Sequence, residues 1–134
     1  LKDLGVRLPA AVAASSPVVD FSGRVWRNSF VQDGDMPHIA QAYLGGYDEK
    51  NPYVSPIYGD FTGFPPLLLQ AGSLEDLKYD SMYLGKALEN TEVDCTVSIW
   101  EGAQHAMGLG PLEDWHSMHC MYQIVGFLAE KAGM

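Results

Sequence analysis

The 134-residue chain has little positive charge. It contains 8 basic residues against 17 acidic ones, which gives a formal net charge of −9 at pH 7. Proteins that bind a nucleic-acid backbone or an anionic membrane surface need clustered Lys and Arg side chains. We therefore predict neither kind of partner. Long apolar runs are also lacking, and none approaches the roughly 20 residues that a membrane-spanning helix requires, so no membrane span is expected.

Cysteine is scarce as well. Cys95 and Cys120 are too few for the disulfide framework of a small secreted domain. Both lie within apolar patterns, which predicts buried free thiols in a reducing compartment and a cytoplasmic location. The chain begins at Leu1 and shows no signal-peptide pattern. A first residue other than Met indicates a processed or cut chain.

Apolar residues are plentiful, at 47% of the chain, and they fall into strand-like and helix-like segments. Strands are predicted over Leu8–Ala14, Pro66–Ala71 and Val93–Trp100. Helices are predicted over Met36–Leu44, Tyr79–Asn90 and Pro111–Lys131. Strands that alternate with helices predict the α/β class, with a mostly parallel sheet flanked by helices. Three strands are few for such a sheet, and their apolar character on both faces indicates that further strands belong beside them.

The last predicted helix has a regular apolar pattern. Pro111 suits a first helical turn. Apolar side chains then follow at helical spacing: Trp115, Met118, Tyr122, Val125 and Leu128. A stripe of this kind normally faces the core, so we expect these five residues to pack on the sheet.

Two acids and a histidine follow neighbouring strands. Glu75 and Asp76 come after the second predicted strand, and His105 follows the third. The carboxyl ends of parallel strands meet at one edge of a sheet, so an acid and the imidazole can meet there. Such a pair is suited to general-base chemistry. The alternative is that the histidine is an ordinary surface residue of a loop. The acids could also lie in the first turn of a helix, where they favour its N-terminus, and this placement is compatible with a catalytic role.

Other candidate groups carry less weight. His116 and His119 are three residues apart beside Cys120, a spacing that places the two rings on one helix face. No further ligand cluster accompanies them, so we predict no metal site and no cofactor. Ser73 and Ser81 lack the surrounding glycines of a nucleophile turn, and we reject both as nucleophiles.

An ordered set of motifs resembles the bacterial hormone-sensitive-lipase-like esterases, which are α/β-hydrolases. The strand entry Asp60–Ser73 is similar to their D-x-x-G-x-P-P stretch, and Trp100–His105 looks like their loop carrying the catalytic histidine. Further similar stretches are Ser16-Pro17 with Asp20, Tyr43–Gly46, Asn51-Pro52 and Ser55-Pro56. The resemblance runs in order over nearly the whole chain.

This resemblance implies hydrolysis of short acyl esters by a Ser–acid–His triad without a metal or organic cofactor. His105 matches the catalytic base. Glu75, 30 residues earlier, matches the acid, with Asp76 as its rival. Many members of the family have Asp at the acid position, so Glu75 departs in residue type. The resemblance also implies that the stretch Trp26–Met36 lines the substrate pocket.

The family's G-x-S-x-G nucleophile turn and H-G-G-G oxyanion loop occur nowhere in the chain. In the family both precede the acid. We therefore expect residues 1–134 to be the C-terminal portion of a single α/β-hydrolase domain whose nucleophile half is absent. Alone, the chain should be inactive and poorly stable. Its expected partners are the missing half or a second copy, and a small ester substrate. The alternatives are a truncated, non-catalytic binding or assembly module, or another α/β-hydrolase such as a peptidase or lactone hydrolase.

Overall fold

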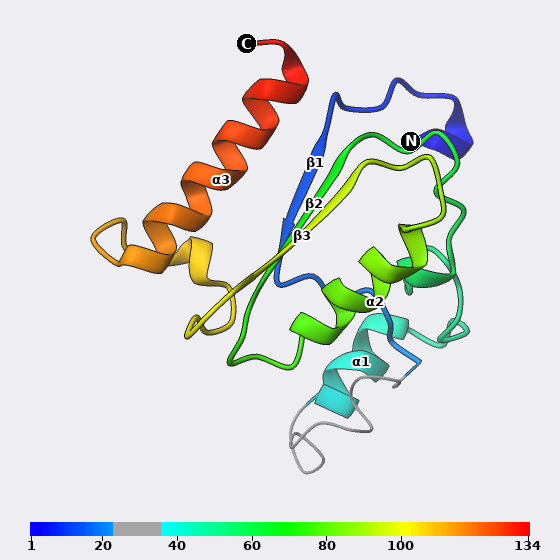
Figure 1. The fold of residues 1–134 in the computed structure, drawn as a ribbon. Coiled ribbons are helices and arrows are strands. Elements are labelled where there is room, and N and C mark those ends of the chain that lie inside the picture. The colour runs from blue at the N-terminus through cyan, green and yellow to red at the C-terminus, as the bar shows by residue number, and fades with distance from the viewer. Residues whose placement is uncertain (23–35) are drawn as a thin grey trace.

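The computed structural model describes residues 1–22 and 36–134 (Figure 1). Apart from the backbone of Met36, the predicted pocket-lining stretch Trp26–Met36 lies outside these residues. The described chain forms one layered α/β unit in which helices lie on both faces of a sheet (Figure 1).

A three-stranded parallel sheet forms the centre of the described residues. Its strands are β1 (Val12–Ser15), β2 (Leu67–Gly72) and β3 (Cys95–Trp100), in the order β1-β2-β3. All six residues of β2 are buried, as expected for a central strand covered on both faces. The predicted α/β class with parallel pairing is confirmed.

In residues 1–22 and 36–134, three α-helices and three short 3-10 helices surround the sheet. The α-helices are α1 (Met36–Leu44), α2 (Lys78–Leu88) and α3 (Trp115–Ala132). The 3-10 helices are η1 (Lys2–Leu4), η3 (Pro56–Tyr58) and η4 (Met107–Leu109). In Figure 1, α3 lies on one side of the sheet and α2 on the other. No helix in the described part of the chain is long and apolar enough to cross a membrane.

Alternate side chains of β2 face the two helical layers, because successive side chains of a strand point to opposite faces. Leu67 and Leu69 pack in a buried cluster with Leu84 and Leu88 of α2. Gln70 points the other way and contacts α3. The chain therefore needs apolar residues at nearly every position of β2.

The contact between β2 and α3 includes a buried polar network. The thiol of Cys120 donates a hydrogen bond of 2.6 Å to Gln70 Oε1, and Gln70 Nε2 donates to Gln123 Oε1. Gln123 Nε2 in turn donates to Ser98 Oγ of β3 at 2.8 Å. Burial raises the pKa of the Cys120 thiol. Because buried polar groups must be paired, this network fixes the position of α3 on the sheet.

The predicted sheet-facing stripe of α3 is wrong for three of its five residues. Trp115, Tyr122 and Val125 are 56%, 67% and 58% exposed. The side of α3 that packs inward instead carries Ser117 and Cys120, both buried. Cys120 faces inward because it bonds the side-chain amide of Gln70 on β2, and Ser117 because its hydroxyl donates to the Met107 carbonyl of η4. Apolar periodicity cannot reveal such a face.

The two largest shifts of predicted boundaries are at the starts of α3 and β1. The helix predicted from Pro111 begins at Trp115, because Asp114 is its N-cap and accepts a hydrogen bond of 2.8 Å from the backbone N–H of Ser117. This bond holds the pKa of Asp114 below its usual value. The first strand, predicted over Leu8–Ala14, covers Val12–Ser15.

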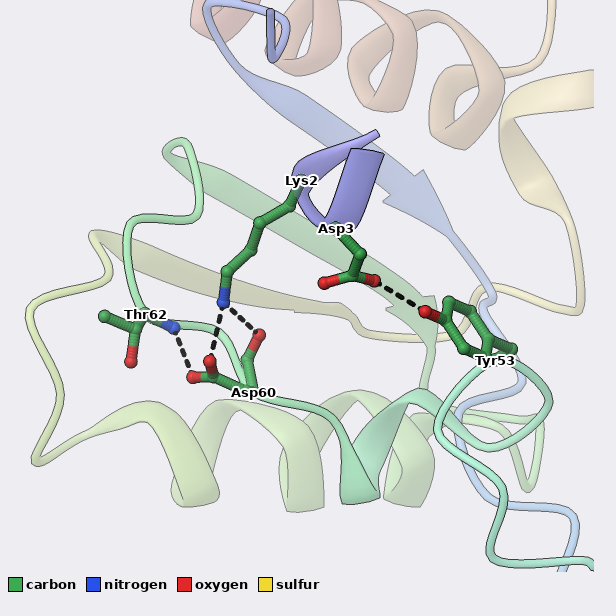
Figure 2. A network of polar contacts seen from close by, with 5 residues as sticks. All are labelled: Lys2, Asp3, Tyr53, Asp60 and Thr62. Atoms are coloured by element: carbon green, nitrogen blue, oxygen red, sulfur yellow. Dashed lines mark hydrogen bonds and ion pairs between the residues drawn. The ribbon is translucent and has the colours of Figure 1, made fainter. Parts of the chain in front are cut away.

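Polar contacts tie η1 to the segment that leads into β2 (Figure 2). Lys2 Nζ lies 2.8 Å from Asp60 Oδ2 and donates to the Asp60 carbonyl at 2.9 Å, while Thr62 N–H donates to Asp60 Oδ1. The hydroxyl of Tyr53 donates to Asp3 Oδ2 at 2.8 Å. The Lys2 bond lowers the pKa of Asp60, and the Asp3 bond raises the pKa of Tyr53. These groups are solvent-exposed, so they orient the segment but stabilise the fold little.

A buried acid of α2 holds the segment that follows β1. Asp80 is fully buried, and one carboxylate oxygen accepts hydrogen bonds from the backbone N–H groups of Val19 at 2.8 Å and Asp20 at 3.0 Å. Burial raises the pKa of Asp80 to about 6, against the lowering effect of these two bonds. The pairing therefore links the first turn of α2 to the loop at the carboxyl end of β1.

We expect this acid to make stability depend on pH in an unusual direction. Folded Asp80 binds its proton more tightly than an unfolded aspartate, whose pKa is about 4. Between about pH 4 and pH 6 its contribution to the free energy of unfolding therefore falls as pH rises, by up to about 3 kcal/mol in total. Asp80→Asn cannot titrate and should lose this component. Urea unfolding of both proteins across the window measures the difference, and parallel pH curves would contradict the prediction.

Candidate active site

The loops that follow the three strands meet at the carboxyl edge of the sheet. Ser16 follows β1, Glu75 lies in the turn after β2, and His105 lies in the loop after β3. Parallel pairing places these three strand ends side by side. Residues far apart in sequence are therefore adjacent here without disturbing the core.

Glu75 and His105 form a direct pair. Glu75 Oε2 lies 2.7 Å from His105 Nδ1. The other carboxylate oxygen, Oε1, accepts hydrogen bonds from Gly72 N–H at 2.7 Å and from the Ser16 hydroxyl at 2.6 Å. The carboxylate is nearly buried, at 5% side-chain exposure, and bonds on both oxygens compensate that burial.

The imidazole of His105 is exposed to solvent, unlike the Glu75 carboxylate, with 62% of its side chain accessible. A carboxylate at Nδ1 favours the tautomer that carries the proton on Nδ1. That tautomer leaves the lone pair of Nε2 free to accept a proton. The arrangement is that of a general base oriented by an acid.

Hydrogen bonds join the loop that carries Glu75 (the acid loop) to the loop that carries His105 (the histidine loop) and hold the two loops in register. Ser73 N–H donates to the Trp100 carbonyl at 2.9 Å, and Leu74 N–H donates to the Ala103 carbonyl at 3.0 Å. Gly102 N–H donates to Ser73 Oγ at 2.9 Å. Backbone bonds of this kind fix the separation of Glu75 and His105 more firmly than the side-chain pair could alone.

Gly72 allows this close approach. A Cβ atom on Gly72 would overlap the carbonyl groups of Ala103 and Gln104 in the histidine loop. The backbone N–H of the same residue also donates to Glu75. A glycine at the end of β2 therefore lets the two loops touch and provides one bond to the acid.

The structure places the rival acid differently. In the described part of the chain, no hydrogen bond joins Asp76 to His105. Both Glu75 and Asp76 precede α2, which begins at Lys78. The alternative that they are acids of the first helical turn is therefore wrong. The catalytic roles of Glu75 and His105 stay a prediction.

The other sequence candidates do not converge. His116 Nε2 lies 2.9 Å from the Glu101 carbonyl, and His119 Nδ1 lies 2.8 Å from the Trp115 carbonyl. Cys120 points toward the sheet instead of toward either ring. Within residues 1–22 and 36–134, no three His, Cys, Asp or Glu side chains are grouped as a metal site would require.

The two rejected serines have no acid–base partner in the described chain. Ser73 Oγ accepts the bond from Gly102 N–H. The hydroxyl of Ser81 is buried in α2, and no hydrogen bond reaches it from the described residues. Neither hydroxyl is bonded to His105.

Sequence reasoning missed three contributors to the site, namely Ser16, Gly72 and Ala106. Ser16 Oγ accepts a bond of 2.9 Å from Ala106 N–H, the residue after the histidine. The available signal was positional, because Ser16 and Gly72 stand where β1 and β2 end. A serine or glycine at a strand end is too common to single out without the three-dimensional pairing.

We expect Gly72→Ala to lower the free energy of unfolding by more than about 2 kcal/mol, since the added methyl overlaps backbone atoms that cannot move independently. Gly126→Ala is the matched control. Gly126 lies on the exposed side of α3 with open space around its Cα. That change should stabilise the helix by about 0.5–1 kcal/mol. Denaturant unfolding of both variants tests the pair, and equal effects would contradict the steric argument.

Comparison with known proteins places the chain in a family. A sequence profile described as "alpha/beta hydrolase fold" matches residues 1–109. An acetyl-hydrolase of Streptomyces hygroscopicus is 34% identical over 126 residues, which cover 89% of this chain and 40% of that protein. The chain thus spans well under two thirds of the length of this relative.

Comparison with solved structures gives the same fold. A hormone-sensitive lipase from a metagenome library superposes with a TM-score of 0.84 at 28% identity, covering 97% of this chain and 47% of that one. The protein EstE5, in a crystal soaked with p-nitrophenyl butyrate, gives a TM-score of 0.89 at 26% identity, with coverage of 99% and 47%. The chain therefore belongs to the α/β-hydrolase family and, within it, resembles the esterases of the bacterial hormone-sensitive lipase group.

Proposed function

We propose that residues 1–134 are the C-terminal portion of a serine carboxylesterase domain and supply the acid and the base of its triad. Glu75 orients the imidazole, and His105 is the base. The nucleophilic serine is contributed by a segment outside these residues. The observation that carries the proposal is the 2.7 Å contact between Glu75 Oε2 and His105 Nδ1, with the imidazole otherwise exposed.

In the proposed reaction, His105 Nε2 takes the proton of the serine hydroxyl as its oxygen attacks the ester carbonyl. The tetrahedral intermediate collapses, the ester C–O bond breaks, and the imidazolium gives its proton to the leaving alcohol. Water then attacks the acyl-enzyme in the same way and releases the carboxylic acid. Glu75 accepts the Nδ1–H bond throughout and stabilises the imidazolium. The step requires no metal or organic cofactor.

The proposed substrates are small esters with short acyl chains. Support comes from the related acetyl-hydrolase and from the soaking of EstE5 with p-nitrophenyl butyrate. A cytoplasmic location is also part of the proposal. Cys95 and Cys120 are both free thiols, which fits a reducing compartment.

The proposed partner is the nucleophile-bearing half of the domain. In the described chain, β1 pairs on one side only, with β2. An edge strand with unpaired backbone groups invites another strand to pair with it. We therefore propose that the missing half covers this edge, with self-association of the isolated chain as the alternative.

The first activity test uses the longest protein encoded in frame with these residues. Glu75→Gln should lower kcat for p-nitrophenyl butyrate by about 10³–10⁴-fold, because the amide favours the wrong imidazole tautomer. His105→Ala should lower it at least as far. Asp76→Asn is the matched control and should leave kcat nearly unchanged. A larger loss in Asp76→Asn than in Glu75→Gln would reassign the acid.

The second test uses the 134-residue chain by itself. Without an attacking hydroxyl, His105 has nothing to activate, so we expect no turnover of p-nitrophenyl acetate above that of the His105→Ala variant. Turnover that this substitution abolishes would contradict the expectation. A fluorophosphonate probe should label the in-frame protein on a serine. An unlabelled, inactive in-frame protein would favour the non-catalytic binding or assembly module.

A further inference from the structure

Ser16 occupies an unusual position at the end of β1. It is 7% exposed, and its φ of +49° lies in the left-handed region that residues with a side chain rarely adopt. Among the described residues, Ala106 is the one other non-glycine residue with positive φ, at +54°. These two residues are joined by the bond from Ala106 N–H to Ser16 Oγ. Unfavourable backbone conformations cluster where the surrounding structure holds a site in place.

The hydroxyl of Ser16 is both a hydrogen-bond donor and a hydrogen-bond acceptor. It donates its proton to Glu75 Oε1 at 2.6 Å and accepts from Ala106 N–H at 2.9 Å. One oxygen atom thereby bridges the acid and the residue next to the base. The bridge joins the carboxyl ends of β1, β2 and β3, since Ser16, Glu75 and Ala106 follow these strands in turn.

The bond from Ser16 also determines which carboxylate oxygen faces the imidazole. Ser16 and Gly72 both donate to Oε1, which leaves Oε2 for His105. Without the hydroxyl, Oε1 keeps a single donor and the carboxylate can turn more freely about its last torsion. The loop that carries His105 loses a support at Ala106 in the same step.

We propose that Ser16 is a positioning residue for the Glu75–His105 pair, acting through the acid and never touching the substrate. This inference rests on the proposed esterase function. It predicts that loss of the hydroxyl lowers kcat through misalignment of the base. KM should change little, because Ser16 contributes nothing to substrate binding.

The test uses the in-frame protein with three serine variants. Ser16→Ala removes the hydroxyl, and Ser16→Gly removes it while adopting the positive φ without strain. Ser81→Ala is the control, since it deletes a buried hydroxyl that makes no hydrogen bond with the described residues. Hydrogen bonds to charged groups are among the stronger ones. We therefore expect both Ser16 variants to lower kcat for p-nitrophenyl butyrate by about tenfold, with KM within about twofold and Ser81→Ala unchanged.

A double-mutant cycle with Glu75→Gln distinguishes positioning from general stability. If Ser16 acts through the acid, Ser16→Gly should cost much less in the Glu75→Gln background than in the parent. Equal losses in both backgrounds, unchanged kcat in folded Ser16→Gly, or unfolding of both Ser16 variants with Ser81→Ala intact would each overturn the proposal.

A readout independent of activity separates this inference from the proposed function. Amide hydrogen exchange at Ala106 should become faster in Ser16→Gly than in the parent, because its acceptor is lost. An inactive parent with this difference would reject the esterase function but keep the link between Ser16 and the histidine loop. An active parent with unchanged exchange and unchanged kcat in Ser16→Gly would reject the link alone.

Discussion

The contact between Glu75 and His105 depends on the side-by-side arrangement of three parallel strands. A buried carboxylate in the turn after β2 meets an exposed imidazole in the loop after β3, at 2.7 Å. Neither loop has a helix or strand of its own to define its path. Their positions follow from the backbone bonds between residues 73–74 and residues 100–103, and from the glycine that lets them approach. The chemistry of the site thus rests on main-chain geometry more than on the strength of the side-chain contact between Glu75 and His105.

Polar contacts outside the site support this geometry from both layers of the fold. On one face, Asp80 of α2 holds the segment after β1 through two backbone N–H groups. On the other, Gln70 of β2 and Cys120 of α3 bond to each other inside the core. Buried polar groups of this kind are costly unless they are paired. Their presence beside the strand ends therefore favours one arrangement of the helices, and hence of the loops, over alternatives that apolar packing alone would allow.

Much of the fold follows from the sequence because it depends on local patterns. Apolar runs such as Leu67–Leu69 and the alternation of strands with helices predicted the parallel sheet, and motif order predicted the family. The positions of the strand ends predicted that an acid would meet His105, and the family resemblance favoured Glu75 over Asp76, but the local residues gave no physical reason for that choice. That choice depends on the turn at Gly72, whose N–H directs the acid, and neighbouring side chains on a turn point in different directions.

Two failures of the sequence predictions, the face of α3 and the role of Ser16, have a common physical origin. The exposed positions of Trp115 and Tyr122 contradict apolar periodicity because the inward side of α3 was selected by a polar partner on β2. The helix start at Asp114 is a separate case, because a local side-chain bond to Ser117 N–H, three residues on, defines it in place of the predicted Pro111. Ser16 belongs to a stretch that resembles the family, but its role was missed because it arises from contacts with Glu75 and Ala106, which are 59 and 90 positions further along the chain. Residue patterns in the sequence do not show which polar groups, far apart in the chain, will pair in the fold.

The most direct test of the account is the tautomer of His105 in the in-frame protein. Two-dimensional NMR of ¹⁵N-labelled histidine distinguishes a neutral ring protonated at Nδ1 from one protonated at Nε2. We predict the Nδ1–H form in the parent and a shift of population toward Nε2–H in Glu75→Gln, with Asp76→Asn unchanged. A neutral His105 ring protonated at Nε2 in the parent, or a ring insensitive to Glu75→Gln, would contradict it.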